Sequence, residues 1–216
     1  MVARPAGGQD CRRRSARSLG RLLLPLVAAL VATAAAAGEA QAITLNLDRD
    51  RAPERLVAVA VRLPYFSAPV LGRTWAVVDR VSGRRTVARL GPPGELLRRP
   101  RVADRNGDGW RDIFLEAHAG NSSPFGELWQ WNGRRATRLW RSTSRPVDRV
   151  ISPEEVLNFP IATRFPDEDG DGVHDVEQDA GVGGACRACA FDRILTVRWR
   201  FSPRAGRYVL LGVEGF

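Results

Sequence analysis

Apolar residues alternate with polar residues along several short stretches of the chain. The clearest stretch is 195–201, where Leu, Val, Trp and Phe occupy every second position and Thr and Arg lie between them. A period of two places these two sets of side chains on opposite faces of a β-strand. Other β-like stretches lie at 56–61, 75–81, 86–90, 128–131, 136–140 and 208–213. The pattern predicts an all-β protein.

Turn residues separate several of these stretches and predict β-hairpins. Asn132-Gly133 is the strongest short-range hairpin signal, and Ser82-Gly83 gives a second. The segment 152–158 instead resembles a helix start, with Ser152 at the cap, Pro next and Glu155 three residues on. We therefore expect strands along the chain and one short helix near 152–158.

The first 42 residues have the pattern of an export signal. A cluster of arginines precedes the apolar run 22–37, and Ala40-Gln41-Ala42 offers the small-x-small pattern of a signal-peptidase site. A retained membrane anchor is the alternative, but the run is short and Ala-rich for a hydrocarbon core of about 30 Å. We expect cleavage after Ala42, which leaves a secreted single domain, 43–216, with no membrane span in the mature chain.

The charge of the chain narrows the class of partner. The chain has 33 basic residues, all of them Arg, against 24 acids, for a formal charge of +9. Residues 1–42 hold six of the arginines and two of the acids, so the mature chain carries +5. That is an ordinary solubility charge for a domain of this size, which argues against nucleic acid as the partner.

The cysteines allow at most one local disulfide in the mature chain. Of the three in the sequence, Cys186 and Cys189 follow the export signal. Outside the cytoplasm a structural disulfide is the default state of such a pair. Free thiols, or redox or metal chemistry, are the alternatives.

An acidic loop of fixed spacing recurs along the chain. Loop 2 (104–112) and loop 3 (167–175) carry oxygen side chains at positions 1, 3, 5 and 9 and Gly at position 6. The oxygen side chains are Asp104, Asn106, Asp108 and Asp112 in loop 2, and Asp167, Asp169, Asp171 and Asp175 in loop 3. A degenerate copy, loop 1 (46–54), carries Asn46, Asp48, Asp50 and Glu54 at these positions but Arg51 at position 6.

This spacing indicates coordination of a hard cation, and of Ca²⁺ in particular. Ca²⁺ takes about six to eight oxygen ligands, and a tight loop directs alternate carboxylates inward. The backbone carbonyls of Trp110 and Val173, at position 7, are expected to add an oxygen each. Neither loop is an EF-hand, because position 12 is Leu115 in loop 2 and Gln178 in loop 3, where an EF-hand needs Glu. The alternative is an Asx-rich turn without metal. In loop 1, Arg51 puts a cation and a Cβ where the turn favours neither.

The loops begin 58 and 63 residues apart, and each is followed by β-like stretches in which Trp recurs. Core packing is the favoured role of these Trp residues, and carbohydrate binding the alternative. An acidic loop before a strand, repeated at this interval, resembles the FG-GAP/VCBS-type repeats of secreted bacterial proteins and integrin-like β-propellers. The resemblance implies Ca²⁺ ligation by the loop residues and three propeller-like units, at about 43–100, 101–163 and 164–216. Three units are fewer than a closed propeller needs, so we expect an open or incomplete array, with a ring completed by association as the alternative.

No catalytic constellation is evident in the sequence. The expected function is a secreted, non-enzymatic Ca²⁺-binding repeat protein that mediates adhesion or ligand binding, or serves as a structural module, at the cell exterior. Its partner is then an unidentified extracellular ligand or surface polymer. One alternative is a small Ca²⁺-dependent hydrolase that uses Glu116 and His118, which share one face of a predicted strand. Another is an Arg-mediated binder of anionic envelope polymers through Arg198 and Arg200.

Overall fold

The computed structural model describes residues 42–50, 52–63, 70–81, 84–118, 124–152, 155–183 and 191–215. The expected export signal, both mature cysteines and the Ser82-Gly83 turn lie outside these residues, apart from Ala42. Within the described part of the chain, no helix is long and apolar enough to span a membrane.

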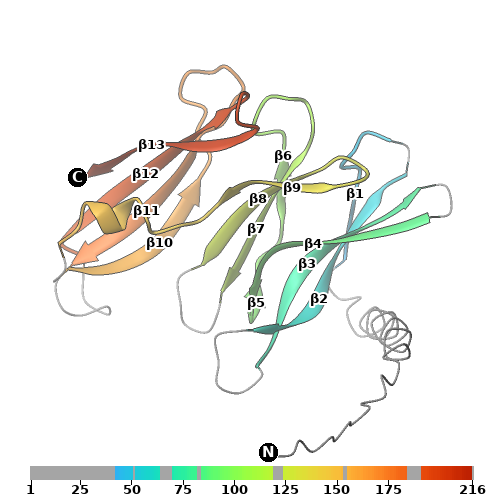
Figure 1. The fold of residues 1–216 in the computed structure, drawn as a ribbon, viewed down its shortest axis with the longest axis horizontal. Helices are drawn as coiled ribbons and strands as arrows, with labels where there is room; N and C mark the ends of the chain where they lie inside the picture. The colour runs from blue at the N-terminus through green and yellow to red at the C-terminus, as the bar shows by residue number, and fades with distance from the viewer. Residues whose placement is uncertain are drawn as a thin grey trace, which may run out of the picture. The chain divides into compact units, whose positions relative to one another are not determined.

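The described residues form three antiparallel β-sheets, and the prediction of an all-β fold is confirmed (Figure 1). Sheet A contains β1 (Ile43–Leu45), β2 (Glu54–Leu63), β3 (Val70–Val81) and β4 (Arg84–Gly94). Sheet B contains β5 (Leu96–Leu97), β6 (Arg101–Ala103), β7 (Asp112–His118), β8 (Phe125–Trp131) and β9 (Ala136–Arg141). Sheet C contains β10 (Val156–Arg164), β11 (Val176–Gly183), β12 (Arg193–Ser202) and β13 (Arg207–Gly215). A 3-10 turn, Val147–Arg149, lies between sheets B and C in the sequence.

The three sheets have one topology in common. In each, four strands that follow one another along the chain pair in that order, with β5 as an extra partner of β7 in sheet B. The acidic loop connects the first of the four strands to the second, as β1 to β2, β6 to β7 and β10 to β11. The same loop therefore has the same place in each sheet.

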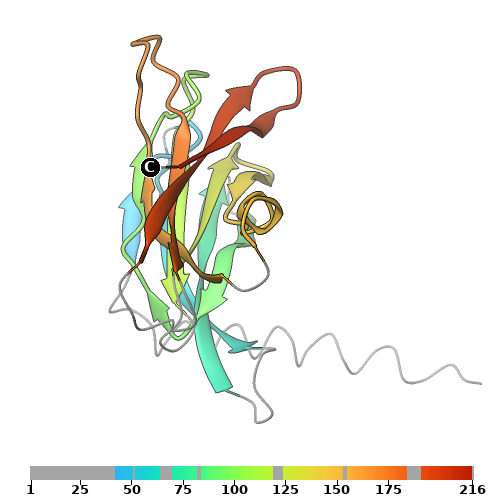
Figure 2. The same ribbon diagram turned by 90° about the vertical axis from the view of Figure 1, so that its left-hand side faces the viewer.

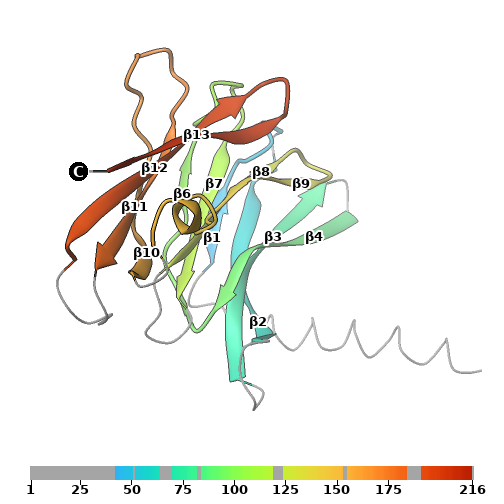
Figure 3. The same cartoon turned by 60° about the vertical axis from the view of Figure 1, so that its left-hand side comes forward.

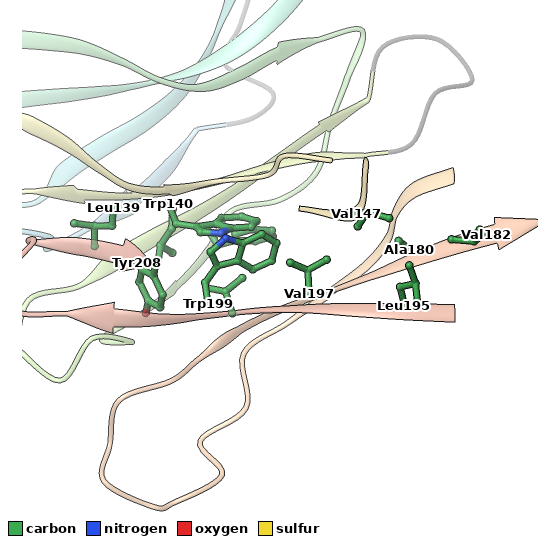
Figure 4. Packing of buried hydrophobic residues seen from close by; sticks show 12 residues of the cluster. Leu139, Trp140, Val147, Ala180, Val182, Leu195, Val197, Trp199 and Tyr208 are labelled. Atoms are coloured by element: carbon green, nitrogen blue, oxygen red, sulfur yellow. The ribbon is translucent and has the colours of Figure 1, made fainter. Parts of the chain in front are cut away.

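Two clusters of buried side chains connect the sheets. One joins sheet A to sheet B and includes Trp75 and Leu115, and the other joins sheet B to sheet C and includes Phe114 and Trp199. Adjacent residues of β7 therefore belong to different clusters, which explains why this strand is buried on both faces. The second cluster contains an edge-to-face pair of Trp140 and Trp199, with ring centroids 5.5 Å apart (Figure 4).

The Trp residues at the repeated position pack in the core as expected. Trp75, Trp131 and Trp199 are each at most 5% exposed. A buried indole face offers no surface to a sugar. The core interpretation is therefore confirmed for these residues.

The helix expected near 152–158 does not form, and that prediction is wrong. The Glu155 carboxylate does accept hydrogen bonds from the Ser152 N–H, at 2.7 Å, and from its hydroxyl, at 3.1 Å, as a capping box requires. The chain nevertheless enters β10 at Val156, because pairing with β11 satisfies its backbone groups across a sheet. β10 precedes loop 3 and belongs to sheet C, so the strands of sheet C begin at Val156.

Candidate metal centre

The three acidic loops share one backbone-to-side-chain hydrogen bond at equivalent positions. In each, the N–H of position 7 donates to Oδ1 of the Asp at position 5. The donors and acceptors are Ala52 and Asp50 at 2.6 Å, Trp110 and Asp108 at 2.8 Å, and Val173 and Asp171 at 2.7 Å. The described residues of loop 1 therefore make the same contact as the two loops that match the sequence pattern fully.

Positive φ angles recur at equivalent positions of the loops. At position 4 the angles are 66° at Arg49, 70° at Gly107 and 71° at Gly170. At position 6 they are 81° at Gly109 and 82° at Gly172, which confirms the role expected of glycine there. Position 6 of loop 1, Arg51, lies outside the described residues. Arg49 accepts the left-handed conformation without being glycine, so this turn forms despite the cost of a Cβ.

The acid at position 9 ends each loop and is buried. Glu54 and Asp112 are 0% exposed, and Asp175 is 4% exposed. Glu54 Oε2 accepts the N–H of Leu47 at 2.5 Å, and Asp112 Oδ2 accepts the equivalent N–H of Arg105 at 3.0 Å. Burial raises the pKa of both acids to about 7, and the charges of Asp108 and Asp104 add to the effect at Asp112. A nearby cation would lower these pKa values again, because it stabilises the ionised carboxylates.

Loop 3 brings three of its four predicted ligands together. Ligand oxygens of Asp167, Asp169 and Asp171 all lie within 4.8 Å of one another. Two oxygens that share one Ca²⁺ at about 2.4 Å each are at most about 4.8 Å apart, so this spacing fits a common ion. Oδ2 of Asp167 accepts the Gly172 N–H at 3.3 Å, while its Oδ1 is buried with no donor in the described part of the chain.

The fourth predicted ligand of loop 3 has a different partner. Both oxygens of Asp175 accept hydrogen bonds from Arg200, at 2.9 and 3.1 Å. Arg200 also lies 3.3 Å from Asp169 Oδ2. Asp175 therefore carries its own counter-ion and does not join the other three carboxylates.

In loop 2, side-chain amide groups donate hydrogen bonds to two of the predicted ligands. Asn106 Nδ2 donates to Asp108 at 3.0 Å, and Gln130 of β8 donates to Asp108 at 2.8 Å and to Asp112 at 3.3 Å. Asp104 Oδ2 accepts the Gly109 N–H at 2.8 Å. Its Oδ1, like that of Asp167 in loop 3, is buried without a donor among the described residues. In both complete loops, the same oxygen of position 1 thus has no hydrogen-bond partner among the residues that the structure describes.

The position 7 residues Trp110 and Val173 are half-buried. Their expected ligation through backbone carbonyls remains a prediction. The Trp110 ring lies under the Arg49 guanidinium, 5.3 Å from its centroid, so loop 1 contacts loop 2 here.

Loop 1 contributes to an acidic cluster that the sequence did not indicate. Ligand oxygens of Asp48, Glu54 and Asp79 lie within 4.8 Å of one another, and Asp79 comes from β3. Asn46 and Asp50 serve the turn itself, since Asn46 Oδ1 accepts the Arg49 N–H at 2.9 Å and its amide donates to the Asp50 carbonyl. An acid at the end of the apolar segment 75–78 was the signal that sequence analysis missed.

The loops form a row along one end of the sheets. The His174 N–H of loop 3 donates to the Arg105 carbonyl of loop 2 at 2.7 Å. Loop 1 reaches loop 2 through Arg49, whose Nη2 occupies the space that a Cβ on Gly109 would need. Figures 1 and 3 show the three loops at the same end of their sheets, and Figure 2 shows loops 2 and 3 side by side.

Glu116 and both arginines of the two alternative functions are engaged in ion pairs. Glu116 Oε1 lies 2.7 Å from Arg98 Nε and 3.8 Å from His118 Nε2. The residue that joins Glu116 and His118 is therefore the cation Arg98. Arg198 contacts carboxylates of Glu168, Glu177 and Glu214, and Arg200 contacts those of Asp169 and Asp175. These guanidinium groups already face anions of the chain itself.

The chain matches no family model, no curated protein and no solved structure. The resemblance to FG-GAP/VCBS-type repeats therefore remains a prediction from the loop pattern.

Proposed function

We propose that this chain is a non-enzymatic β-repeat protein whose acidic loops 2 and 3 bind Ca²⁺. The observation that carries the proposal is the position 1 aspartate of both loops: Oδ1 of Asp104 and Oδ1 of Asp167 are buried, and no described residue donates to either. A buried, unpartnered carboxylate oxygen is costly, and a cation is the group that removes the cost. Because the same oxygen is unpartnered in two separate loops, we infer that each loop binds the same kind of ion.

The chemistry of the ligand atoms favours a hard cation such as Ca²⁺ over softer metal ions. The predicted ligands are all oxygens, which suits hard cations, and neither loop contains Cys. His174 of loop 3 directs Nδ1 to the Phe165 carbonyl at 3.0 Å, so it belongs to a backbone contact of the loop.

Bound ions would stabilise the arrangement of the sheets. Each loop connects two paired strands, and loops 2 and 3 are joined by a backbone hydrogen bond. An ion that holds the loop carboxylates together therefore holds the edge at which two sheets meet. This suits the incomplete propeller-like array that the sequence pattern predicts, and a secreted module that binds an extracellular ligand or surface polymer.

Isothermal titration calorimetry with Ca²⁺ tests the proposal. Asp104→Ala and Asp167→Ala are each expected to remove one bound ion per chain from the total of the unmodified protein. Asp148→Ala is the matched control, because this exposed acid lies in the 3-10 turn outside the loops. Ca²⁺ uptake that both loop variants leave unchanged would overturn the proposal.

A further inference from the structure

We infer that Asp48, Glu54 and Asp79 form a third, buried site for a divalent cation, in which Asp79 supplies from β3 the ligand that loop 1 lacks. This inference rests on the proposed function for the class of ion. It goes beyond the proposed function because it assigns a further site. Arg51 at position 6 counts against metal binding by the motif of loop 1, and Asp79 lies outside that motif, 25 residues after Glu54.

The pairing of β2 with β3 brings Glu54 and Asp79 together. Arg55 pairs with Val78, so the residues that precede and follow them, Glu54 and Asp79, are direct cross-strand neighbours. Alternation along β3 puts Asp79 on the same face as Trp75 and Val77, which are core residues. The two carboxylates therefore lie on the core face of sheet A.

Burial of these groups points to a ligand. Glu54 is 0% exposed and Asp79 is 1% exposed. Glu54 Oε2 accepts the Leu47 N–H at 2.5 Å, but its Oε1 is buried and has no donor within the described ranges. A divalent cation shared by the three acids would satisfy that oxygen.

The equivalent places in the other two sheets contain hydrogen-bond donors. Asp112 pairs across the strands with Gln130, which donates to it, and Asp175 is opposite Arg200, which donates to both its oxygens. In sheet A the cross-strand residue is the acid Asp79, which as a carboxylate only accepts. Where the other sheets use an amide or a guanidinium, sheet A has a third anionic oxygen donor suited to a metal.

The site lies against the neighbouring sheet. Asp48 Oδ2 is 2.5 Å from the position that a Cβ on Gly133 would take, in the turn between β8 and β9. The turn of sheet B thus contacts a ligand of the proposed ion. An ion here would stabilise the contact between sheets A and B, as the ions proposed for loops 2 and 3 would stabilise the contact between sheets B and C.

Equilibrium dialysis against Ca²⁺ alone, with bound ions counted per chain, tests the inference. Asp79→Ala is expected to remove one ion from the total of the unmodified chain. Asp167→Ala, a matched loss of one carboxylate in loop 3, is expected to remove a different one, so the double variant loses two. If Asp79→Ala does not fold, Asp48→Ala replaces it, because Asp48 is only half-buried and lies in the loop.

The outcomes separate this inference from the proposed function. An Asp79→Ala chain that binds as many ions as the unmodified chain, while Asp167→Ala loses one, overturns the third site and leaves loop 3 intact as a site. Loss in Asp79→Ala without loss in Asp167→Ala supports the third site and contradicts the assignment of loop 3.

Discussion

The backbone amide of His174 donates to the carbonyl oxygen of Arg105 at 2.7 Å, which joins loop 3 to loop 2. The hydroxyl of Tyr208, on β13, lies 3.0 Å from the His174 carbonyl and 3.4 Å from the Arg105 carbonyl. Three segments far apart in the sequence thus share one hydrogen-bonded point. Because Tyr208 is 6% exposed, water does not easily replace its hydroxyl there.

Tyr208→Phe is expected to lower the free energy of unfolding by about 1 kcal/mol, since it removes one buried hydrogen bond and keeps the ring. The ring contact with Phe201, at 5.5 Å between centroids, remains in the variant. Urea denaturation measures the change. Val209→Ala, at an exposed site on the same strand, controls for β13. A Tyr208→Phe protein as stable as the unmodified chain would show that this contact does not join the loops.

Gly133→Ala is expected to destabilise the protein by about 1–3 kcal/mol, the cost of a left-handed non-Gly residue. Gly133 has a φ of 79°, and its added Cβ would also meet Asp48 Oδ2 at 2.5 Å. Gly212→Ala is the matched control, because Gly212 has open space around it and no positive φ is recorded there. Equal melting temperatures for the two variants would contradict the close approach of loop 1 to the turn.

Local patterns in the sequence were sufficient for many of the strands and for the glycine positions of loops 2 and 3, but not for β10 or β11. Alternation in 195–201 gave β12, and Gly109 and Gly172 take the positive φ that the motif requires. The Ser152–Glu155 signal misled because its hydrogen bonds form in a turn just as well as at a helix end. Whether a helix follows depends on the pairing of β10 with β11, which no local signal encodes.

The cross-strand partners of the loops could not be predicted from the loop motif. Asp79, Gln130 and Arg200 each face a position 9 acid, and they belong to strands that follow the motif at a distance. Their identity decides how much negative charge each loop has left for a cation. The charge available for a cation in each loop therefore depends on the sheet register as well as on the loop motif.

Arg200→Gln is expected to increase the Ca²⁺ affinity of loop 3 and to destabilise the chelated protein. Arg200 is the counter-ion of Asp175 and Asp169, and Gln is what sheet B has at the equivalent place. Titration calorimetry and thermal unfolding in chelator measure the two effects. Arg198→Gln serves as the control, because Arg198 pairs with Glu168, Glu177 and Glu214. Weaker binding in Arg200→Gln would show that this arginine helps to build the site.

The chelated protein is expected to lose stability from Glu54 and Asp112 as the pH rises from about 4 to about 7. Their pKa values rise on folding from 4.5 and 3.8 to about 7, so the unfolded chain releases these protons first. The contribution is complete below the unfolded pKa and is lost as the pH passes the folded one. Urea denaturation across this range, compared with Glu54→Gln/Asp112→Asn, isolates the effect. A pH dependence identical in both proteins would refute it.

The most direct test of Ca²⁺ binding by the loops is thermal unfolding of the chelated protein with and without added Ca²⁺. An ion that binds only the folded state stabilises it by about 2.7 kcal/mol per site at a hundredfold excess over Kd. We expect the melting temperature to rise with Ca²⁺ concentration, and to rise less in Asp104→Ala and Asp167→Ala. A melting temperature that stays constant across the titration would contradict the account.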